Sequence, residues 1–309
     1  MSPSRRLLAM LSLLFSAPVV AAPAQAVGIS VGSLDNPFFK ALIRGAVTEI
    51  RAGNPQAKID SVGSDFQLEK QQQQIDRFIA GRVDLILLVA AHPQQIAPAV
   101  RRAQAAGIRV IAVDVEAEGA DITVQSDNLQ AGRLVCDHLA RAIGGKGNFV
   151  IQNGPSVSSV RDRVHGCREA LKNHPDIRLL SDSENGKASS YGGMMLMRTH
   201  LANYRRIDAV FAINDRQAIG ADLAARKAGR NTIAIGSVDG SPDIEASLRQ
   251  DSLIQVSACQ DPFILGQTAA RLGQQLLDGR APATNQVRLP VQLLTRDNVD
   301  HYKGWTAKR

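Results

Sequence analysis

Short apolar runs alternate with amphipathic stretches along nearly the whole chain after residue 26. The run 85–89 (Leu-Ile-Leu-Leu-Val) is apolar at every position, which is typical of parallel strands covered on both faces. The stretch 67–80 instead carries Leu68, Ile75 and Phe78 on one helical face. Strand–helix units in series predict parallel sheets with right-handed crossovers.

The same alternation predicts two domains. About ten strands are many for one domain of this kind, and the pattern restarts after a glycine-rich break at 144–147. We therefore expect two doubly wound α/β domains, divided near Ser126. The expected strands are 27–31, 57–62, 85–89, 109–113, 123–125, 148–152, 177–181, 209–213, 232–238, 254–259 and a final extended run 287–294. The expected helices are 37–51, 67–80, 96–106, 129–143, 157–171, 188–201, 217–228, 242–249 and 262–277.

The first 26 residues have the layout of a secretory signal peptide. Arg5 and Arg6 precede the apolar run 7–20, and two small-residue cleavage motifs follow, ending at Ala24 and at Ala26. The apolar run is shorter than the roughly 20 residues of a membrane span. No cysteine near the cleavage motifs offers a lipid attachment point, so we expect a mature protein that is free in the periplasm.

The charge of the chain does not indicate a nucleic-acid partner. The net charge of +7 falls to about +5 if Arg5 and Arg6 leave with the signal peptide. Basic residues are scattered, and aromatic residues make up 4% of the chain, too few for the stacking surfaces of single-strand binders.

Three cysteines remain after the signal peptide: Cys136, Cys167 and Cys259. An odd number cannot pair completely, and the wide spacing fits no zinc pattern. We interpret them as small buried side chains, with a Cys136–Cys167 disulfide as the alternative.

The stretch 27–39 combines a strand, a turn and a helix start with two large aromatics. Asn36 is placed to cap the helix and Pro37 suits its first position. Phe38 and Phe39 then fall in the first turn, near the carboxyl end of a strand, where open α/β sheets bind small ligands. A capped helix with two core phenylalanines is an equally good interpretation of this stretch alone.

Polar residues follow several other strands. Each alone is most often a turn former or a helix cap, and we expect Asp215 to cap its own helix. Together they provide carboxylates, amides and guanidiniums that hydrogen-bond a sugar or polyol, with Phe38 or Phe39 against its apolar face. These residues are Asp114, Asn214, Asp239 and Gln260 after strands, and Arg161 and Arg163 early in the helix 157–171.

The set is poorly suited to catalysis. None of the six histidines has a metal-ligand spacing, and no nucleophile elbow or Walker A loop is present. The glycine-rich 144–147 precedes a strand, whereas a phosphate loop follows one. We therefore expect no enzyme activity, no metal and no cofactor.

Four motifs together resemble the periplasmic sugar-binding proteins of ABC importers, and the ribose-binding group in particular. They are Asp-Asn-Pro-Phe-Phe39, Val-Phe-Ala-Ile-Asn-Asp215, Val-Asp-Gly-Ser-Pro-Asp243 and Gln260-Asp-Pro, within a resemblance that runs from about Val27 to Leu294. Sugar-responsive repressors share this fold but carry an N-terminal helix-turn-helix where this chain has a signal peptide.

The resemblance implies two Rossmann-like lobes of the type I periplasmic binding protein fold, joined by a three-strand hinge near Ser126, Gln260 and 290–293. It places 27–126 and 261–290 in the first lobe, and 127–260 and 291–309 in the second. It further implies a monomer that closes on a sugar and then docks on an inner-membrane ABC permease. The implied ligand-binding residues are Asn36, Phe38, Phe39, Asp114, Arg161, Asn214, Asp239 and Gln260.

Three departures from the ribose binders argue against ribose itself. Val115 stands where they have arginine, Gly32 where they have serine, and Ala188 where they have a stacking aromatic, with Tyr191 one turn away as a substitute. We expect a monosaccharide or related small polyol. A periplasmic sensor subunit for a chemoreceptor or histidine kinase is the alternative function, and an exported α/β enzyme is a second.

Overall fold

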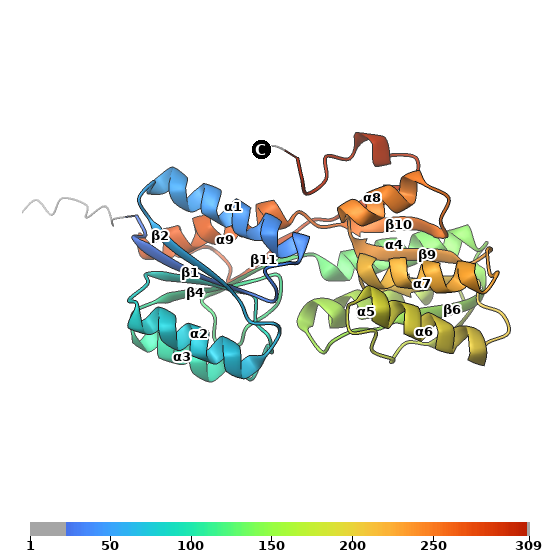
Figure 1. Ribbon diagram of the computed structural model, residues 1–309, viewed down its shortest axis with the longest axis horizontal. Helices are drawn as coiled ribbons and strands as arrows, with labels where there is room; N and C mark the ends of the chain where they lie inside the picture. Colours follow the sequence, from blue (N-terminus) through green and yellow to red (C-terminus); the bar gives the residue numbers. More distant parts are fainter. Residues whose placement is uncertain (1–22, 308–309) are drawn as a thin grey trace, which may run out of the picture.

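The computed structural model describes residues 23–307, and nearly all of the expected signal peptide lies outside the described residues. The described chain forms two α/β lobes side by side along the long axis of the molecule (Figure 1). Each lobe is built on one six-stranded sheet. The fold class expected from the strand–helix alternation is confirmed.

The first lobe has a sheet of strand order β11-β5-β4-β3-β1-β2, with every neighbouring pair parallel. Helices α1 and α9 pack against each other on one face, and α2 and α3 pack on the other (Figure 1). The elements are β1 (Ala26–Val31), α1 (Pro37–Gly53), β2 (Lys58–Gly63), α2 (Leu68–Ala80), β3 (Leu85–Leu88), α3 (Ala97–Ala105), β4 (Arg109–Val113), β5 (Ile122–Ser126), α9 (Pro262–Leu277) and β11 (Gln286–Leu289).

The second lobe repeats this plan with strand order β12-β10-β9-β8-β6-β7, in which only β12 is antiparallel. Helices α4 and α5 cover one face, while α6, α7 and α8 cover the other. The elements are α4 (Asn128–Ala142), β6 (Lys146–Gln152), α5 (Ser158–Leu171), β7 (Asp176–Ser181), α6 (Ser190–Asn203), β8 (Ala209–Ala212), α7 (Asp215–Lys227), β9 (Ala234–Asp239), α8 (Pro242–Arg249), β10 (Ile254–Cys259) and β12 (Gln292–Thr295).

The chain passes between the lobes three times: from β5 to α4, from β10 to α9, and from β11 to β12. The last passage lies within the extended run 287–294, which forms two strands in two different sheets. Pro290 separates them, and proline lacks the N–H that a continuous ladder needs. We propose lobe limits at Ser126, Gln260 and Pro290, because the sheet membership of the chain changes at these points.

A C-terminal segment, residues 299–305, follows β12 and begins with the 3₁₀ turn η1 (Val299–His301). On the second lobe the Tyr302 hydroxyl donates to the Gly240 carbonyl, 3.0 Å away. On the first lobe the carbonyl of Trp305 accepts from the Arg44 guanidinium at 2.5 Å. The C-terminal segment therefore contacts both lobes.

The start of α1 follows the expected chemistry. The side chain of Asn36 accepts a hydrogen bond from the backbone N–H of Phe38, 3.0 Å away, and Pro37 occupies the first helical position. The capping prediction is confirmed, and Phe38 and Phe39 are both buried.

Cys136 and Cys167 form a disulfide that ties α4 to α5, with Cα atoms 5.1 Å apart. The interpretation of these two residues as separate buried thiols was therefore wrong, and the alternative holds. Cys259 is free and buried. The pairing requires α4 and α5 to pack together, which neither helix reveals by itself.

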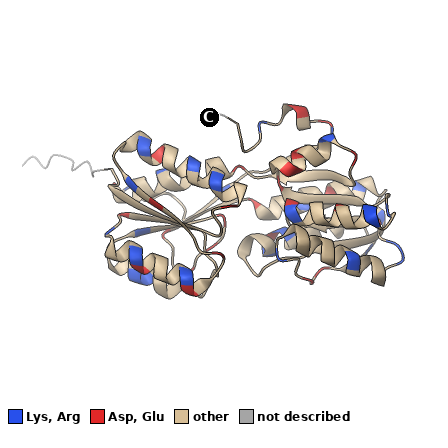
Figure 2. Cartoon of the chain, viewed as in Figure 1, with Lys and Arg blue, Asp and Glu red and all other residues tan. Residues whose placement is uncertain are grey.

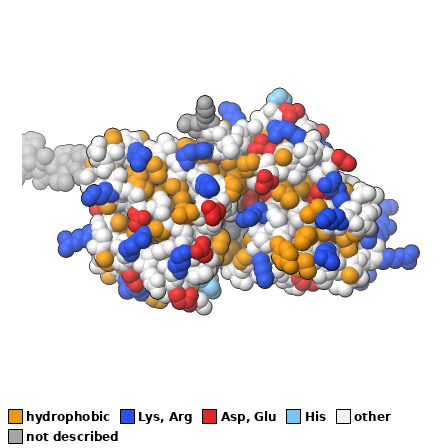
Figure 3. All heavy atoms as spheres, in the orientation of Figure 1, with side chains coloured by type: hydrophobic (Ala, Val, Ile, Leu, Met, Phe, Trp, Pro, Cys, Tyr) orange, Lys and Arg blue, Asp and Glu red, His pale blue; other side chains and the backbone are white. Residues whose placement is uncertain are grey.

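Charged residues lie mainly on the outer helices of both lobes, with both signs interspersed (Figure 2). The face in view shows no continuous patch of one sign (Figure 3). Within residues 23–307, no helix is long and apolar enough to span a bilayer.

Candidate ligand-binding site

The two lobes meet at loops that follow the carboxyl ends of β4 and β6. The backbone N–H of Glu116, after β4, donates to the Ser158 hydroxyl at the start of α5, 2.9 Å away. The Glu116 carboxylate also lies 3.3 Å from the Arg161 guanidinium. The carboxyl edges of the two sheets therefore face the same interlobe region, as expected for a ligand site in open α/β sheets.

Asp239, at the end of β9, is the centre of a buried polar group on the second lobe. Its Oδ1 accepts from Gln260 Nε2 at 2.8 Å and lies 3.4 Å from Arg163 Nη1. Burial raises the pKa of Asp239 to about 6, while Arg163 and Gln260 lower it and Asp114 raises it further. The backbone φ of Asp239 is 141°, a conformation that side-chain-bearing residues seldom adopt.

Asp114 follows β4 on the first lobe, also in a strained conformation with φ of 69°. Its carboxylate accepts no hydrogen bond from the described residues, although its backbone N–H donates to Val124. Burial raises the pKa of Asp114 to about 6, and Arg163 partly opposes the rise. Strained residues with unused hydrogen-bonding capacity are characteristic of binding sites.

Gln260 lies in the second passage between the lobes and is only 3% exposed. Its Nε2 donates a hydrogen bond to Asp239, but its buried Oε1 has no hydrogen-bond partner in the described residues. An unpaired buried acceptor is costly unless a ligand or water satisfies it. Asp114, Asp239 and Gln260 therefore all carry acceptor oxygens in this region, and their role in binding hydroxyl groups stays a prediction.

Asn214 caps α7, because its Oδ1 accepts from the Gln217 backbone N–H at 3.0 Å. The expectation that Asp215 is the cap was wrong. Asp215 is the first residue of α7 and is fully buried, and its carboxylate accepts from the hydroxyls of Ser237 and Ser257 at 2.6 and 2.7 Å. Burial, together with nearby Asp239, raises the pKa of Asp215 to about 7. Asp215 thus supports the loop that carries Asp239.

Phe38 and Phe39 form the apolar side of this region. Their ring centroids lie 5.4 Å apart in an edge-on arrangement, and Phe38 makes a similar 5.4 Å contact with Trp305. The indole N–H of Trp305 donates to the Gln260 carbonyl. Trp305 was not identified from the sequence, because no periodic pattern marks the chain beyond 294.

Arg161 and Arg163, both near the start of α5, lie in different surroundings. Arg163 is buried and bonds to Asn128 Oδ1 and to the Ile213 carbonyl, both at 2.8 Å, besides facing Asp239. Arg161 has a side chain 58% exposed and pairs with Glu116 and Asp162. Arg161 therefore bridges the lobes at the rim, and its role in binding stays a prediction. The burial of Arg163 could have been predicted from its position on the helix, since it lies on the same apolar face as Val160, Val164 and Cys167.

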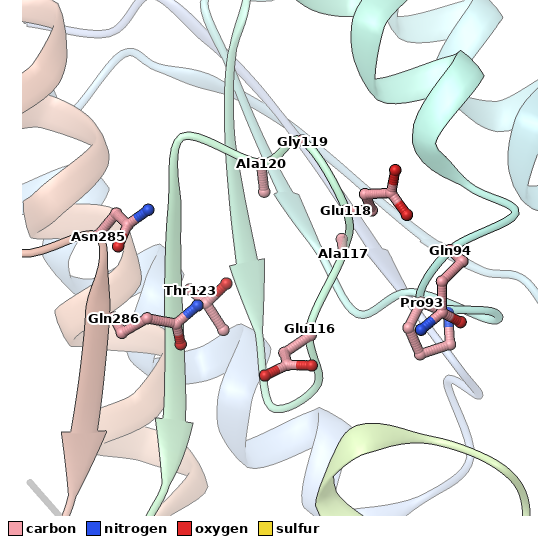
Figure 4. Close-up of a pocket in the computed structure, with 10 residues that line it drawn as sticks. All are labelled: Pro93, Gln94, Glu116, Ala117, Glu118, Gly119, Ala120, Thr123, Asn285 and Gln286. Atoms are coloured by element: carbon pink, nitrogen blue, oxygen red, sulfur yellow. The ribbon is translucent and has the colours of Figure 1, made fainter.

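A separate cavity of about 310 Å³ lies in the first lobe beside the loop after β4 (Figure 4). None of the eight predicted ligand residues lines it, although Glu116 reaches it from the interlobe contact. In residues 23–307, no group of three or more potential metal ligands converges. The arrangement holds acceptors, a guanidinium and apolar rings, which suits reversible binding of a hydroxylated solute.

The sequence profile of the periplasmic binding protein domain matches residues 27–281. The Ribose import binding protein RbsB of Bacillus subtilis is 29% identical over 274 residues, which cover 87% of each chain. The Xylitol-binding protein of Mycolicibacterium smegmatis is 29% identical over 89% of this chain and 78% of its own length. The D-apiose import binding protein of Paraburkholderia graminis is 30% identical over 93% and 92% of the two chains.

Solved structures share the fold. An ABC transporter solute binding protein from Bacillus halodurans with bound myo-inositol superposes with a TM-score of 0.83, at 23% identity, over 91% of this chain and 98% of its own. A periplasmic solute binding protein from Actinobacillus succinogenes with bound D-allose gives 0.81, at 23% identity, over 90% and 99%. By its sequence, with the fold in agreement, this chain belongs to the periplasmic binding protein family.

Proposed function

We propose that this protein is the periplasmic solute-binding component of an ABC importer. In this proposal it binds a monosaccharide or related small polyol between its lobes. The observation that carries the proposal is that Asp239 of the second lobe accepts from the hinge residue Gln260 and lies close enough to Asp114 of the first lobe for the Asp114 charge to raise its pKa. A solute that bonds all three favours the closed arrangement by its differential affinity. The relatives named for ribose, xylitol and D-apiose support this solute class.

The family consists of solute-binding components of transporters, which are not enzymes. The relatives are named as import or solute-binding proteins, and none favours the sensor alternative. In the proposed cycle, the closed form docks on an inner-membrane permease and releases the solute there.

We further propose that the protein reaches the periplasm by a cleaved signal peptide and carries no lipid anchor. The Cys136–Cys167 disulfide supports this, because disulfides persist in oxidising compartments. The N–H groups of Gln25 and Ala26 both donate to Asp84 Oδ2, at 2.7 and 2.9 Å. Cleavage after Ala24 keeps these bonds, whereas cleavage after Ala26 removes them. The intact mass of the exported protein distinguishes the two.

The test of the binding function is calorimetric titration of refolded protein with D-ribose, xylitol, D-apiose, D-allose and myo-inositol. Refolding removes any solute carried over from expression. We expect one of these to bind with a dissociation constant on the order of micromolar, about −8 kcal/mol. Absence of heat with every solute would refute the proposed solute class.

A further inference from the structure

Phe66 is an exposed aromatic residue at the carboxyl edge of the first sheet. It lies in the loop between β2 and α2, and it is 58% exposed, in contrast to the buried Phe38 and Phe39. Its ring centroid lies 6.1 Å from that of Phe39. Phe66 therefore extends the aromatic side of the candidate site toward solvent.

The ring of Phe66 occupies space that is open only because residue 32 is glycine. A Cβ atom added to Gly32 would lie 2.3 Å from Cζ of Phe66 and 3.0 Å from Cε2 of Phe39. Gly32 is the first residue after β1. The Phe66 ring thus covers the carboxyl end of β1.

The backbone of this loop is strained. Asp65 and Phe66 have φ of 53° and 57°, in the left-handed region where a bulky side chain is an outlier. Such strain persists where the surrounding structure enforces it, and it concentrates at functional sites. A large apolar residue whose backbone is strained and whose side chain is exposed contributes little to the stability of the fold.

The second lobe contains the same loop without the aromatic residue. Lys187 and Ala188, between β7 and α6, have φ of 55° and 48°. The two loops hold equivalent positions, because each follows the second strand of its lobe and precedes the next helix. An alanine is sufficient for this backbone shape, so the loop itself does not require the phenyl ring of Phe66.

Phe66 also lies next to the part of the sheet where open α/β sheets bind ligands. The chain leads from β1 to β2 on one side, while β3 pairs with β1 on the other, which makes the end of β1 a topological switch point. Ligands bind in the crevice at such points. The face of an aromatic ring carries partial negative charge, which attracts the C–H groups of a sugar ring.

We propose that Phe66 is a further ligand-contacting residue, and that the solute is cyclic and lays a C–H face on this ring. The inference rests on the proposed function and narrows its solute class to cyclic sugars and cyclitols. Open-chain polyols have no fixed C–H face, so they gain less from the contact.

The experiment compares wild type, Phe66→Ala, Gly32→Ser and the double variant in the full mature protein. The probes are D-ribose and myo-inositol as cyclic solutes and xylitol as the open-chain solute. For the cyclic solute that wild type binds, we expect either single change to weaken binding about tenfold. The double variant should bind about as weakly as Phe66→Ala, not a further tenfold more weakly, because the serine side chain acts mainly by displacing the Phe66 ring, with its 3.0 Å approach to Phe39 as the lesser contact. Leu223→Ala, an exposed apolar truncation on α7, is the matched control and should bind as wild type.

Phe66→Asn tests the alternative that Phe66 is only structural. Asparagine accepts the left-handed conformation, so the unfolding midpoint without solute should equal or exceed that of wild type while binding weakens. A midpoint lowered by several degrees would assign Phe66 to the fold and overturn the inference, even if no probe binds. Unchanged binding of a cyclic probe by Phe66→Ala, or tighter wild-type binding of xylitol than of both cyclic probes, would also overturn it. Wild-type protein that binds none of the five solutes named under the proposed function would instead refute the proposed solute class.

Discussion

The indole N–H of Trp305 lies 3.1 Å from the backbone carbonyl oxygen of Gln260 and donates a hydrogen bond to it. This bond links the C-terminal segment to the hinge residue whose side chain holds Asp239. The same indole packs edge-on against Phe38 of the first lobe and is 6% exposed. One residue near the chain end therefore contacts two of the predicted ligand-binding residues.

Replacing Trp305 by phenylalanine should weaken solute binding about two- to tenfold. The ring contact with Phe38 is largely kept, but one hydrogen bond worth about 1 kcal/mol to the hinge is lost. Calorimetric titration measures the change. Tyr204→Phe, which removes the hydrogen bond to the Leu180 carbonyl on the second lobe, is the control for a lost bond elsewhere. Equal affinities for wild type and W305F would contradict the prediction.

Trp305 is the only tryptophan of the chain, so the tryptophan fluorescence reports on the surroundings of Phe38 and Gln260. We expect the emission of the wild-type protein to shift or change intensity as a bound sugar closes the lobes around Phe38 and Gln260. Stopped-flow mixing of the protein with the solute of the panel that binds most tightly measures this change in emission. An emission spectrum that stays constant at saturation would show that binding does not reach the C-terminal segment.

Asp239→Asn should weaken binding by about tenfold to a hundredfold while the protein still folds. Asparagine keeps the shape of the side chain, but it loses the charge-assisted hydrogen bonds, worth roughly 1.5–3 kcal/mol. Titration and thermal unfolding are measured together. Asp176→Asn, at an exposed carboxylate that begins β7, is the matched control. Undiminished affinity in D239N would remove Asp239 from the site.

Solute affinity should fall as the pH drops through about 6. Asp114 and Asp239 both have a pKa raised to about 6, so the ionised acceptors are lost in this range. If one ionised carboxylate is needed, affinity falls about tenfold between pH 7 and pH 5. Titrations across this range measure the effect, and D114N should show a shallower dependence. A flat profile in wild type would mean that neither charge contacts the solute.

The free energy of unfolding of the solute-free protein should decrease as the pH rises, whereas the solute affinity should increase. Burial raises the pKa of Asp215 to about 7, above its ordinary value of 3.8, so the folded state binds more protons than the unfolded state between these values. The free energy of unfolding therefore decreases as the pH rises from about 4 to about 7. Urea unfolding at several pH values measures the slope. Asp215→Asn should reduce the slope, and an identical slope in D215N would contradict the assignment.

Removing the disulfide with a Cys136→Ala, Cys167→Ala double variant should lower the free energy of unfolding by about 2–4 kcal/mol, because the bond closes a loop of 31 residues. Urea unfolding provides the measurement. Reduction of wild type should have a similar effect, whereas the reductant should leave the double variant unchanged. A double variant as stable as oxidised wild type would show that the bond does not constrain the second lobe.

The fold was predictable because apolar runs and helical periods alternate with little interruption. The strand-end positions of Asp114, Asp239 and Gln260 followed from the same pattern, since the carboxyl ends of parallel strands share one edge of a sheet. The choice between Arg161 and Arg163 needed the helical phase of α5. Two residues apart on a helix, they point to different sides.

Other features depended on contacts that no local pattern encodes. The Cys136–Cys167 pair requires the packing of α4 on α5. Trp305 lies beyond the last strand, and its partners Phe38 and Gln260 are distant in the sequence. Phe66 stands in a loop between two elements, and its relation to Gly32 appears only when β1 and β2 are aligned. Long-range packing, rather than local propensity, determines these positions.

The third passage between the lobes has a consequence for the order in which the protein folds. The first lobe is completed by α9 and by β11, which pairs with β5 at the edge of the sheet. Its last strand ends at Leu289, although its first strand begins at Ala26. A nascent chain that ends before β11 cannot close either sheet, so both lobes are completed only when residues 286–295 have been synthesised. Both lobes therefore stay incomplete until β11 and β12 have been synthesised, and an incompletely folded polypeptide is what threading through a membrane pore requires.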